Sequence, residues 1–583
     1  MLDVQIISEH DTASLNAAIG IIDDAWEELR RSPSVQRQMG AVPARLPEVS
    51  FAEAQRRSAV GRSLLRRLDE LESSPLPHDL ALTLRLVRFR SNSWAREAEW
   101  YWMVVDPLGE GYFGLFLPTA YCGGFVFTSV HDDLASFPFA ESGDTDRYLA
   151  LVADYARLID QFTERTAGQA ERDIRMPKVQ VRQARALLGA LKAGVREVLT
   201  VSAQRLVAIP AANFSRELET RIKTRIEPAF DRAIEGLSNT YLARAPEKVG
   251  IGQYSGGSEV YAELVKLHTT LALTPEQVHA RGIARMEEIA ASKDAIREEL
   301  HSQTDDKTFI AHLNQDPRWR ANTVEGVRAM FHRYIDRLKP RFSDYFYREP
   351  QATYGVAPLP EALQSSMTYG YYDVPREGHA AGIYRFNASN LTKQALVHIG
   401  SLTYHELMPG HHLHFATQRE NELLHPFRKY NFVNAYNEGW AEYAAMFAGE
   451  IGLYEQPEER YGRLAMDAFL TCRLVVDTGM NVLGWSLERA RDYMRANSGM
   501  SEAEIRTESL RYSCDIPGQA LAYKLGDASI LGFREQMRRT LGERFNLKDF
   551  HAAVLGAGAL PIPDLEWHVE HETKRLMNSG RKQ

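Results

Sequence analysis

The sequence predicts a mainly helical protein with a small sheet, and three observations support this fold class. Residues 13–74 and 80–99 carry apolar side chains at three- and four-residue spacing with charges opposite, as amphipathic helices do. Residues 148–167 and 179–208 continue this pattern, and Thr274-Pro275-Glu276-Gln277 opens another helix with a capping box and an early proline. Between residues 353 and 390, SSMTYGYYDVP and GIYRFNASN are β-branched or aromatic runs bounded by Gly and Pro, which predicts short strands.

Three further segments decide the predicted organisation of the chain. Residues 107–127 are rich in Gly and aromatic side chains, and we expect a loop or short strands there. Residues 457–497 are expected to form one long helix. A Pro- and Gly-rich break at 245–257 is the predicted boundary between an N-terminal helical lobe, residues 1–250, and a C-terminal catalytic lobe, residues 251–583.

Composition narrows the class of protein. The 583 residues are 44% hydrophobic and 25% charged, which is typical of a globular protein. The net charge of −8 gives no support for a nucleic-acid partner. The three scattered cysteines predict neither a disulfide framework nor a C-x-x-C metal site. The first residues lack the pattern of a secretory signal, and no apolar run approaches the roughly 20 residues of a membrane helix. We therefore expect a cytoplasmic protein without a membrane partner.

A histidine-rich stretch at residues 401–417, SLTYHELMPGHHLHFAT, carries the strongest functional signal. Six of the 18 histidines fall between His398 and His425. His405 is followed directly by Glu406, a pair typical of zinc hydrolases, in which imidazoles bind the metal and the Glu acts as general base on water. The stretch predicts a site for one zinc ion per chain, with His405 as a ligand and Glu406 as the catalytic base.

The spacing to the second histidine ligand is not that of H-E-x-x-H. The fourth residue after His405 is Pro409, which cannot bind a metal, and His411 and His412 follow at the sixth and seventh positions. Pro409 and Gly410 predict a break in the helix that would bring His411 back beside His405. His412 remains the alternative, because seven residues return to the same helical face about 10 Å along the axis.

A second helical signal, NAYNEGWAEYAAMFAG at residues 434–449, supplies carboxylates. Glu438 and Glu442 are four residues apart and share one helical face. The neighbouring Trp440 and Tyr443 indicate a mostly buried helix, in which carboxylates need a partner or a metal. Glu438 is the predicted third zinc ligand, and Glu442 is expected to accept the free N–H of a ligating histidine.

HELMPGHH, NEGWAEY and RYSCDIPGQALAYKLG together resemble the DUF885 family of bacterial proteins. Similar segments extend from about residue 250 to the end of the chain, and the resemblance is weak before that. The family is distantly similar to zincin metallopeptidases of the angiotensin-converting-enzyme and oligopeptidase type. The Gly410-His411 pair is similar to the Gly-His ending of the peptidase motif with two residues inserted ahead of it, which favours His411 over His412.

The resemblance implies a large two-lobed gluzincin fold with a deep central cleft and a small sheet beside the metal helix. The edge strand of such a sheet pairs with extended substrate, and GIYRFN, which contains Tyr384, is expected at that edge. Tyr523, with Tyr512 as second choice, is expected to stabilise the oxyanion. Arg511 and Lys524 are expected to hold a substrate carboxylate.

Three positions depart from the family pattern. His414 stands where the family usually has Gln, Asn481 where it usually has His, and Ala445 where it often has a carboxylate. Asn481 matters most, because a histidine there would be expected to hold substrate or the oxyanion. His412 and His414 remain: one of them would be the ligand if the break does not return His411 to His405, and another is expected to hydrogen-bond near the substrate.

These features predict a zinc metallohydrolase that cleaves an amide bond in a short peptide or peptide-like small molecule. Two alternatives remain. One is a metal-dependent enzyme of specialised metabolism that acts on a non-peptide C–N bond, which the change at Asn481 favours. The other is a non-catalytic metal-binding scaffold, in which Glu406 would be dispensable.

Overall fold

The computed structural model describes residues 9–579 except 72–75, 110, 207–211, 362–363, 365–366, 368, 378, 390 and 392–394. The predicted helical residues 72–74 and 207–208, residue 110 of the predicted loop, and the predicted strand residues 365, 366, 368 and 390 lie outside the described residues. Elsewhere the chain is mainly helical with a small sheet, so the predicted class is confirmed.

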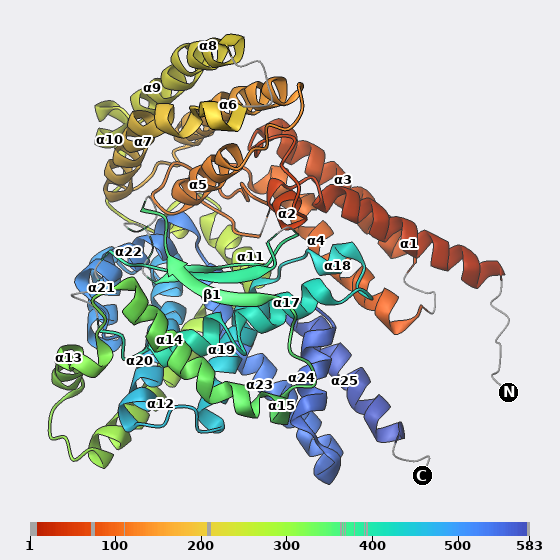
Figure 1. Ribbon diagram of the computed structural model, residues 1–583, viewed down its shortest axis with the longest axis vertical. Helices are drawn as coiled ribbons and strands as arrows, with labels where there is room; N and C mark the ends of the chain where they lie inside the picture. Colours follow the sequence, from red (N-terminus) through yellow and green to blue (C-terminus); the bar gives the residue numbers. More distant parts are fainter. Residues whose placement is uncertain are drawn as a thin grey trace.

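The first part of the chain consists of helices joined by loops. They are α1 (Glu9–Leu29), α2 (Pro33–Gln38), α3 (Phe51–Glu70), α4 (His78–Trp100), α5 (Cys122–Ala135), α6 (Asp144–Glu171), α7 (Lys178–Leu199), α8 (Ala212–Arg221), α9 (Glu227–Gly236) and α10 (Asn239–Arg244). In Figure 1 helices α6 to α10 form the top of the molecule, and α1 and α3 extend to the right.

The second part contains further helices and the strands. The helices before the sheet are α11 (Gly257–Thr269), α12 (Pro275–Glu299), α13 (Asp306–Gln315), α14 (Val324–Leu338) and α15 (Phe342–Tyr345). The predicted capping box at Thr274 is present at the start of α12. The helices after the sheet are α16 (Ile399–Glu406), α17 (His411–Glu420), α18 (Pro426–Lys429), α19 (Asn434–Glu450), α20 (Pro457–Asn481), α21 (Leu487–Asn497), α22 (Glu502–Leu510), α23 (Ala522–Leu541), α24 (Leu547–Gly556) and α25 (Ile562–Ser579).

Within the described residues, three strands form one sheet, which lies between the upper helices and those below it (Figure 1). The strands are β1 (Thr353–Pro358), β2 (Gly370–Asp373) and β3 (Ala381–Phe386), in the order β1-β3-β2. β3 runs parallel to β1 and antiparallel to β2, with Tyr384 opposite Tyr372. The expectation that GIYRFN forms the edge is therefore wrong: it is the central strand, and β2 is an edge.

Two other expectations for local structure are corrected. The end of the predicted loop at 107–127 is helical from Cys122, because Val126, Phe127, Val130 and Leu134 bury one apolar face that outweighs the low helix propensity of the preceding glycines. The long helix expected at 457–497 is two helices, α20 and α21. Gly484, with φ of +71°, turns the chain between them.

Two large clusters of buried apolar side chains make the core. One joins side chains of α1, α3 and α4 to side chains of residues 321–569. The other is built mainly from residues 46–278 and includes Leu474 of α20 and Leu525 of α23. Residues on both sides of position 250 therefore contribute to each cluster, and the predicted boundary there stays a prediction. Among the described residues, no helix combines the length and the apolar character needed to cross a membrane.

Candidate metal centre

The histidine-rich stretch folds as two helices separated by a break at the predicted place. α16 ends at Glu406, residues 407–410 are not helical, and α17 begins at His411. A side chain on Gly410 would lie 1.9 Å from the carbonyl oxygen of His405, so only glycine fits in the break. The Trp440 indole of α19 donates to the carbonyl of Pro409 at 2.9 Å. The break is therefore held against the helix that carries Glu438.

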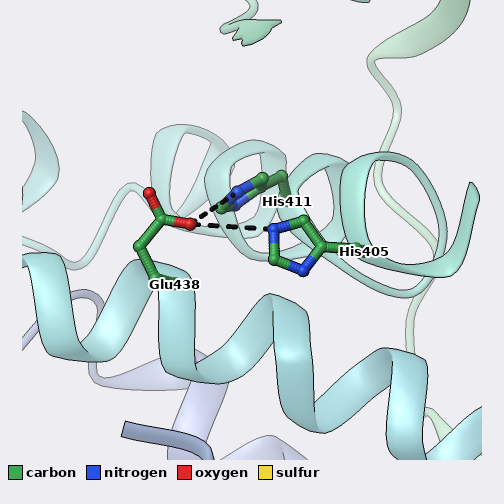
Figure 2. Close-up of side chains that lie close together, drawn as sticks. All are labelled: His405, His411 and Glu438. Atoms are coloured by element: carbon green, nitrogen blue, oxygen red, sulfur yellow. Dashed lines mark ion pairs between the residues drawn. The ribbon is translucent and has the colours of Figure 1, made fainter. Parts of the chain in front are cut away.

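This break brings His405 and His411 together over α19. Their ring centroids are 4.8 Å apart, and both rings point toward the Glu438 carboxylate (Figure 2). Glu438 Oε2 lies 3.3 Å from His411 Nε2 and 3.7 Å from His405 Nε2. All three side chains are at least nine-tenths buried. The structure thus brings together the two imidazoles and the carboxylate that the sequence predicts as metal ligands.

The donor atoms have the spacing of metal ligands. Two ligands of a tetrahedral zinc ion, each about 2.0–2.1 Å from the metal, lie about 3.3–3.4 Å from each other. The two distances from Glu438 Oε2 are close to this value and longer than an ordinary charge-assisted hydrogen bond. Glu438 Oε2 is also buried without a hydrogen-bond partner among the described residues. Two imidazoles and a carboxylate with these properties fit a zinc ion.

Glu442 and His414 contact the ring nitrogens of the two histidines that face away from Glu438. His405 Nδ1 lies 3.3 Å from Glu442 Oε2, and His411 Nδ1 lies 2.9 Å from His414 Nε2. Burial lowers the pKa of His414 well below its usual value, so its ring stays neutral. A neutral ring can accept a hydrogen bond from His411. These contacts leave the Nε2 lone pairs of His405 and His411 directed at the space beside Glu438.

Glu442 belongs to a buried network of charges. Arg463 donates to its Oε1 at 2.5 Å, and the Lys524 ammonium lies 3.6 Å from the same atom. Lys524 also pairs with Asp467 and Asp527. Burial raises the pKa of Glu442, but Arg463 and Lys524 outweigh it and hold that pKa at about 2. Glu442 is therefore ionised and can orient His405.

Replacing Glu442 with Gln is expected to weaken zinc binding about 10- to 100-fold, because His405 loses an anionic acceptor. Competition with a chelator measures the affinity. Asp527→Asn is the matched control, since it removes a charge from the same network without touching His405. Equal losses in both variants would contradict a specific role for Glu442.

The three donors lie on the wall of a cavity of about 380 Å³. Glu406, Tyr523 and Arg511 also line it. Glu406 is 8% exposed, and burial raises the pKa of its carboxyl. The Tyr523 ring stacks on His405 with centroids 6.0 Å apart, and burial keeps its pKa above the usual value. The hydroxyl therefore stays protonated and able to donate a hydrogen bond.

The other predicted site residues are not among the described residues that line this cavity. His412 points to the sheet: its Nε2 donates to the carbonyl of Ala352, and its Nδ1 accepts from the Tyr372 hydroxyl. Tyr384 is fully buried on the central strand. Lys524 is held in the network around Glu442, where it cannot reach a substrate carboxylate.

The side chains of Asn481 and Tyr512 likewise form hydrogen bonds with other residues of the chain. The Asn481 amide donates to Asp477 and to the carbonyl of Tyr512, and its oxygen accepts from the backbone of Ile251. The Tyr512 hydroxyl donates to Glu508. Asn481 therefore gives no reason to expect altered chemistry in the cavity.

Several residues that line the cavity are not predicted as site residues by the sequence. Arg473 and Glu508 line the wall, as do Tyr121 and Tyr372. Arg473 could have been noticed, because it is one charged residue in the apolar run FLTCRLVV of α20. The tyrosines carry no such signal, since an aromatic residue in a strand or a loop most often serves packing.

Comparison with known proteins identifies the family and the fold. The sequence model described as "Bacterial protein of unknown function (DUF885)" matches residues 33–569. No curated protein matches the chain. The crystal structure of a "putative lipoprotein" from Colwellia psychrerythraea superposes with a TM-score of 0.81 at 23% identity, covering 98% of this chain and all of that one.

A second solved structure, a "putative lipoprotein of unknown function" from Shewanella oneidensis, gives a TM-score of 0.70 at 18% identity. It covers 95% of this chain and 99% of the other. At these identities the two structures show a shared fold and nothing of function. The family match extends over most of the chain, including the HELMPGHH and NEGWAEY motifs. The chain belongs to the bacterial DUF885 family.

Proposed function

We propose that this protein is a zinc-dependent hydrolase of gluzincin type that cleaves an amide bond in a short peptide or peptide-like substrate. One observation carries the proposal: the Nε2 atoms of His405 and His411 lie at the spacing of metal ligands from Glu438 Oε2. This oxygen has no hydrogen-bond partner among the described residues, and the three side chains line a cavity. The distant resemblance to zincin peptidases supports the same reading, with the cavity as part of a deep cleft between two helical lobes.

The residues around the donors have roles that suit hydrolysis. His405, His411 and Glu438 would hold the zinc ion, which when bound lowers the pKa of water and polarises a carbonyl. Glu406 follows His405 in sequence and lines the cavity, so it is placed to accept a proton from the attacking water. Tyr523 stacks on His405 and donates a hydrogen bond to the developing oxyanion.

Metal content tests the proposal directly. Purified wild-type protein is expected to hold about one zinc ion per chain, and His405→Ala and Glu438→Ala are expected to lose it. His412→Gln is the matched control, because this neighbouring histidine faces Ala352 and Tyr372, and it should retain the metal. Elemental analysis after dialysis measures all four proteins.

The outcomes separate the proposal from its competitors. Wild-type protein that stays metal-free after zinc is supplied would overturn the proposal of a zinc-dependent hydrolase. Zinc bound at His405 and Glu438 without cleavage of any member of a mixed dipeptide pool would favour the non-catalytic scaffold. The cytoplasmic location expected from the sequence stays a prediction.

A further inference from the structure

Two buried arginines lie on the wall of the cavity beside the metal centre. Arg473 comes from α20 and Arg511 from a π-helical turn, Arg511–Asp515, that follows α22. They are 4% and 8% exposed. The Arg473 guanidinium lies 4.6 Å from the centre of the Tyr523 ring, which itself stacks on His405. Arg473 is therefore a neighbour of the predicted ligand His405, and Arg511 lines the same cavity.

One carboxylate, that of Glu508, pairs with both arginines. Its Oε2 lies 3.2 Å from Arg473 Nη2 and 3.5 Å from Arg511 Nη1. The hydroxyl of Tyr512 also donates to this carboxylate. Among these side chains the positive charges exceed the negative ones by one. A second anion can therefore bind in this wall without leaving an uncompensated negative charge.

The other carboxyl groups near Arg511 do not remove this excess. Asp477 accepts hydrogen bonds from the Tyr261 hydroxyl and the Gly518 amide, and Asp515 accepts one from Gln180. Neither forms a salt bridge with Arg511 in the part of the chain that the structure describes. Burial raises the pKa of each to about 7, which reduces their negative charge near neutral pH.

Each arginine also keeps one buried donor without a partner. Arg473 uses Nε for the Tyr512 hydroxyl and Nη2 for Glu508, but its Nη1 has no hydrogen-bond partner among the described residues. Arg511 donates from Nη2 to Gln519, and its Nε has no such partner. Unpaired buried donors leave the charge of each guanidinium incompletely compensated, so an anion bound beside them in the cavity is favoured. A carboxylate, with two acceptor oxygens, suits a pair of guanidinium groups.

We propose that Arg473 and Arg511 bind the C-terminal carboxylate of the substrate, so that the enzyme cleaves peptides close to a free C-terminus. Tyr523 contacts both His405 and Arg473, and one extended residue spans at most about 3.6 Å, so only a short C-terminal segment fits between the zinc site and the arginines. The cleavage rests on the proposed hydrolase function, whereas the binding preference does not.

A binding experiment tests the arginines apart from turnover. Zinc-loaded Glu406→Gln protein is equilibrated with a pool of N-acetyl dipeptides that carry neutral side chains. The same pool with C-terminal amides serves as the comparison, and mass spectrometry after equilibrium dialysis measures retention. Free acids are expected to be retained at least about 10-fold more than amides, since charge-assisted hydrogen bonds are lost in the amide.

Variants in the same background identify the residues responsible. Arg511→Gln is expected to remove most of the preference for free acids, and Arg473→Lys to reduce it, because lysine keeps the charge but not the planar fork. Arg37→Gln is the matched control: it removes a cation that lines the same cavity but is already paired with Asp133 at 2.7 Å, and it should keep the preference.

Glu508→Gln gives the sharpest outcome. It removes the competing anion but keeps an acceptor for Tyr512, so free-acid retention is expected to rise, whereas a purely structural role for Glu508 would lower it. Equal retention of acids and amides by the parent protein would overturn the carboxylate site, even if wild-type protein hydrolyses both pools. Retention of acids without any hydrolysis by wild type would uphold the carboxylate site and reject the hydrolase.

Discussion

Replacing Glu406 with Gln is expected to slow hydrolysis about 100- to 10,000-fold while zinc stays bound. The amide keeps the size and position of the side chain on the cavity wall but cannot accept the proton of the attacking water. The proposed metal ligands are His405, His411 and Glu438, and the substitution removes none of them. Initial rates on the free-acid dipeptide pool, with zinc content measured on the same samples, check both parts.

This variant distinguishes loss of chemistry from loss of metal. His405→Ala should lose both activity and zinc, whereas Glu406→Gln should lose activity alone. A Glu406→Gln protein that cleaves the pool at the wild-type rate would exclude Glu406 as the base. A variant that loses zinc together with activity would show that Glu406 acts on the metal site rather than on water.

Replacing Gly526 with Ala is expected to cause a large loss of stability, because helices α19 and α23 meet at Gly439 and Gly526. A β-carbon on Gly526 would lie 2.0 Å from the carbonyl oxygen of Ala435 and 2.7 Å from the α-carbon of Gly439. Backbone atoms cannot move aside as a side chain would, so α19 must shift. Overpacking of this kind costs about 1–3 kcal/mol or more.

The shift would also reach the candidate metal centre, because α19 carries Glu438 and Glu442. Chemical denaturation of the zinc-free protein measures the free energy of unfolding, and chelator competition measures zinc affinity. Gly532→Ala on the same helix is the control: it is exposed and nothing lies within 4 Å of an added β-carbon, so it should stabilise by about 0.5–1 kcal/mol. Wild-type stability in Gly526→Ala would contradict the close packing of the two helices.

Local patterns made much of the fold predictable. Amphipathic spacing marks α3 and α6, the capping box marks the start of α12, and aromatic runs mark β2 and β3. Each signal depends on neighbours within a few residues, which sequence displays directly. The helical start of α5 was missed because buried packing, which the local sequence does not show, overrides the low helix propensity of glycine.

The candidate ligands were readable for the same reason. His405 and Glu406 are adjacent in the sequence, and Glu438 and Glu442 are one helical turn apart. The Pro409-Gly410 pair predicts the helix break that places His411 beside His405. The order of the strands was not readable, because pairing of β3 with both β1 and β2 depends on contacts between segments distant in sequence. GIYRFN has the composition of a strand, but composition does not say whether a strand is central or at the edge.

The sequence by itself determined the helical class, the family, and the side chains that converge at the candidate metal centre. Only the tertiary structure decided which of the remaining polar residues face the cavity. Arg473, Arg511 and Lys524 are all cations in or near helices, yet the first two line the cavity and the third is held by Glu442, Asp467 and Asp527. The physical reason is that a charged side chain is stabilised by whichever opposite charges surround it, and those partners are supplied by helices far apart in the chain.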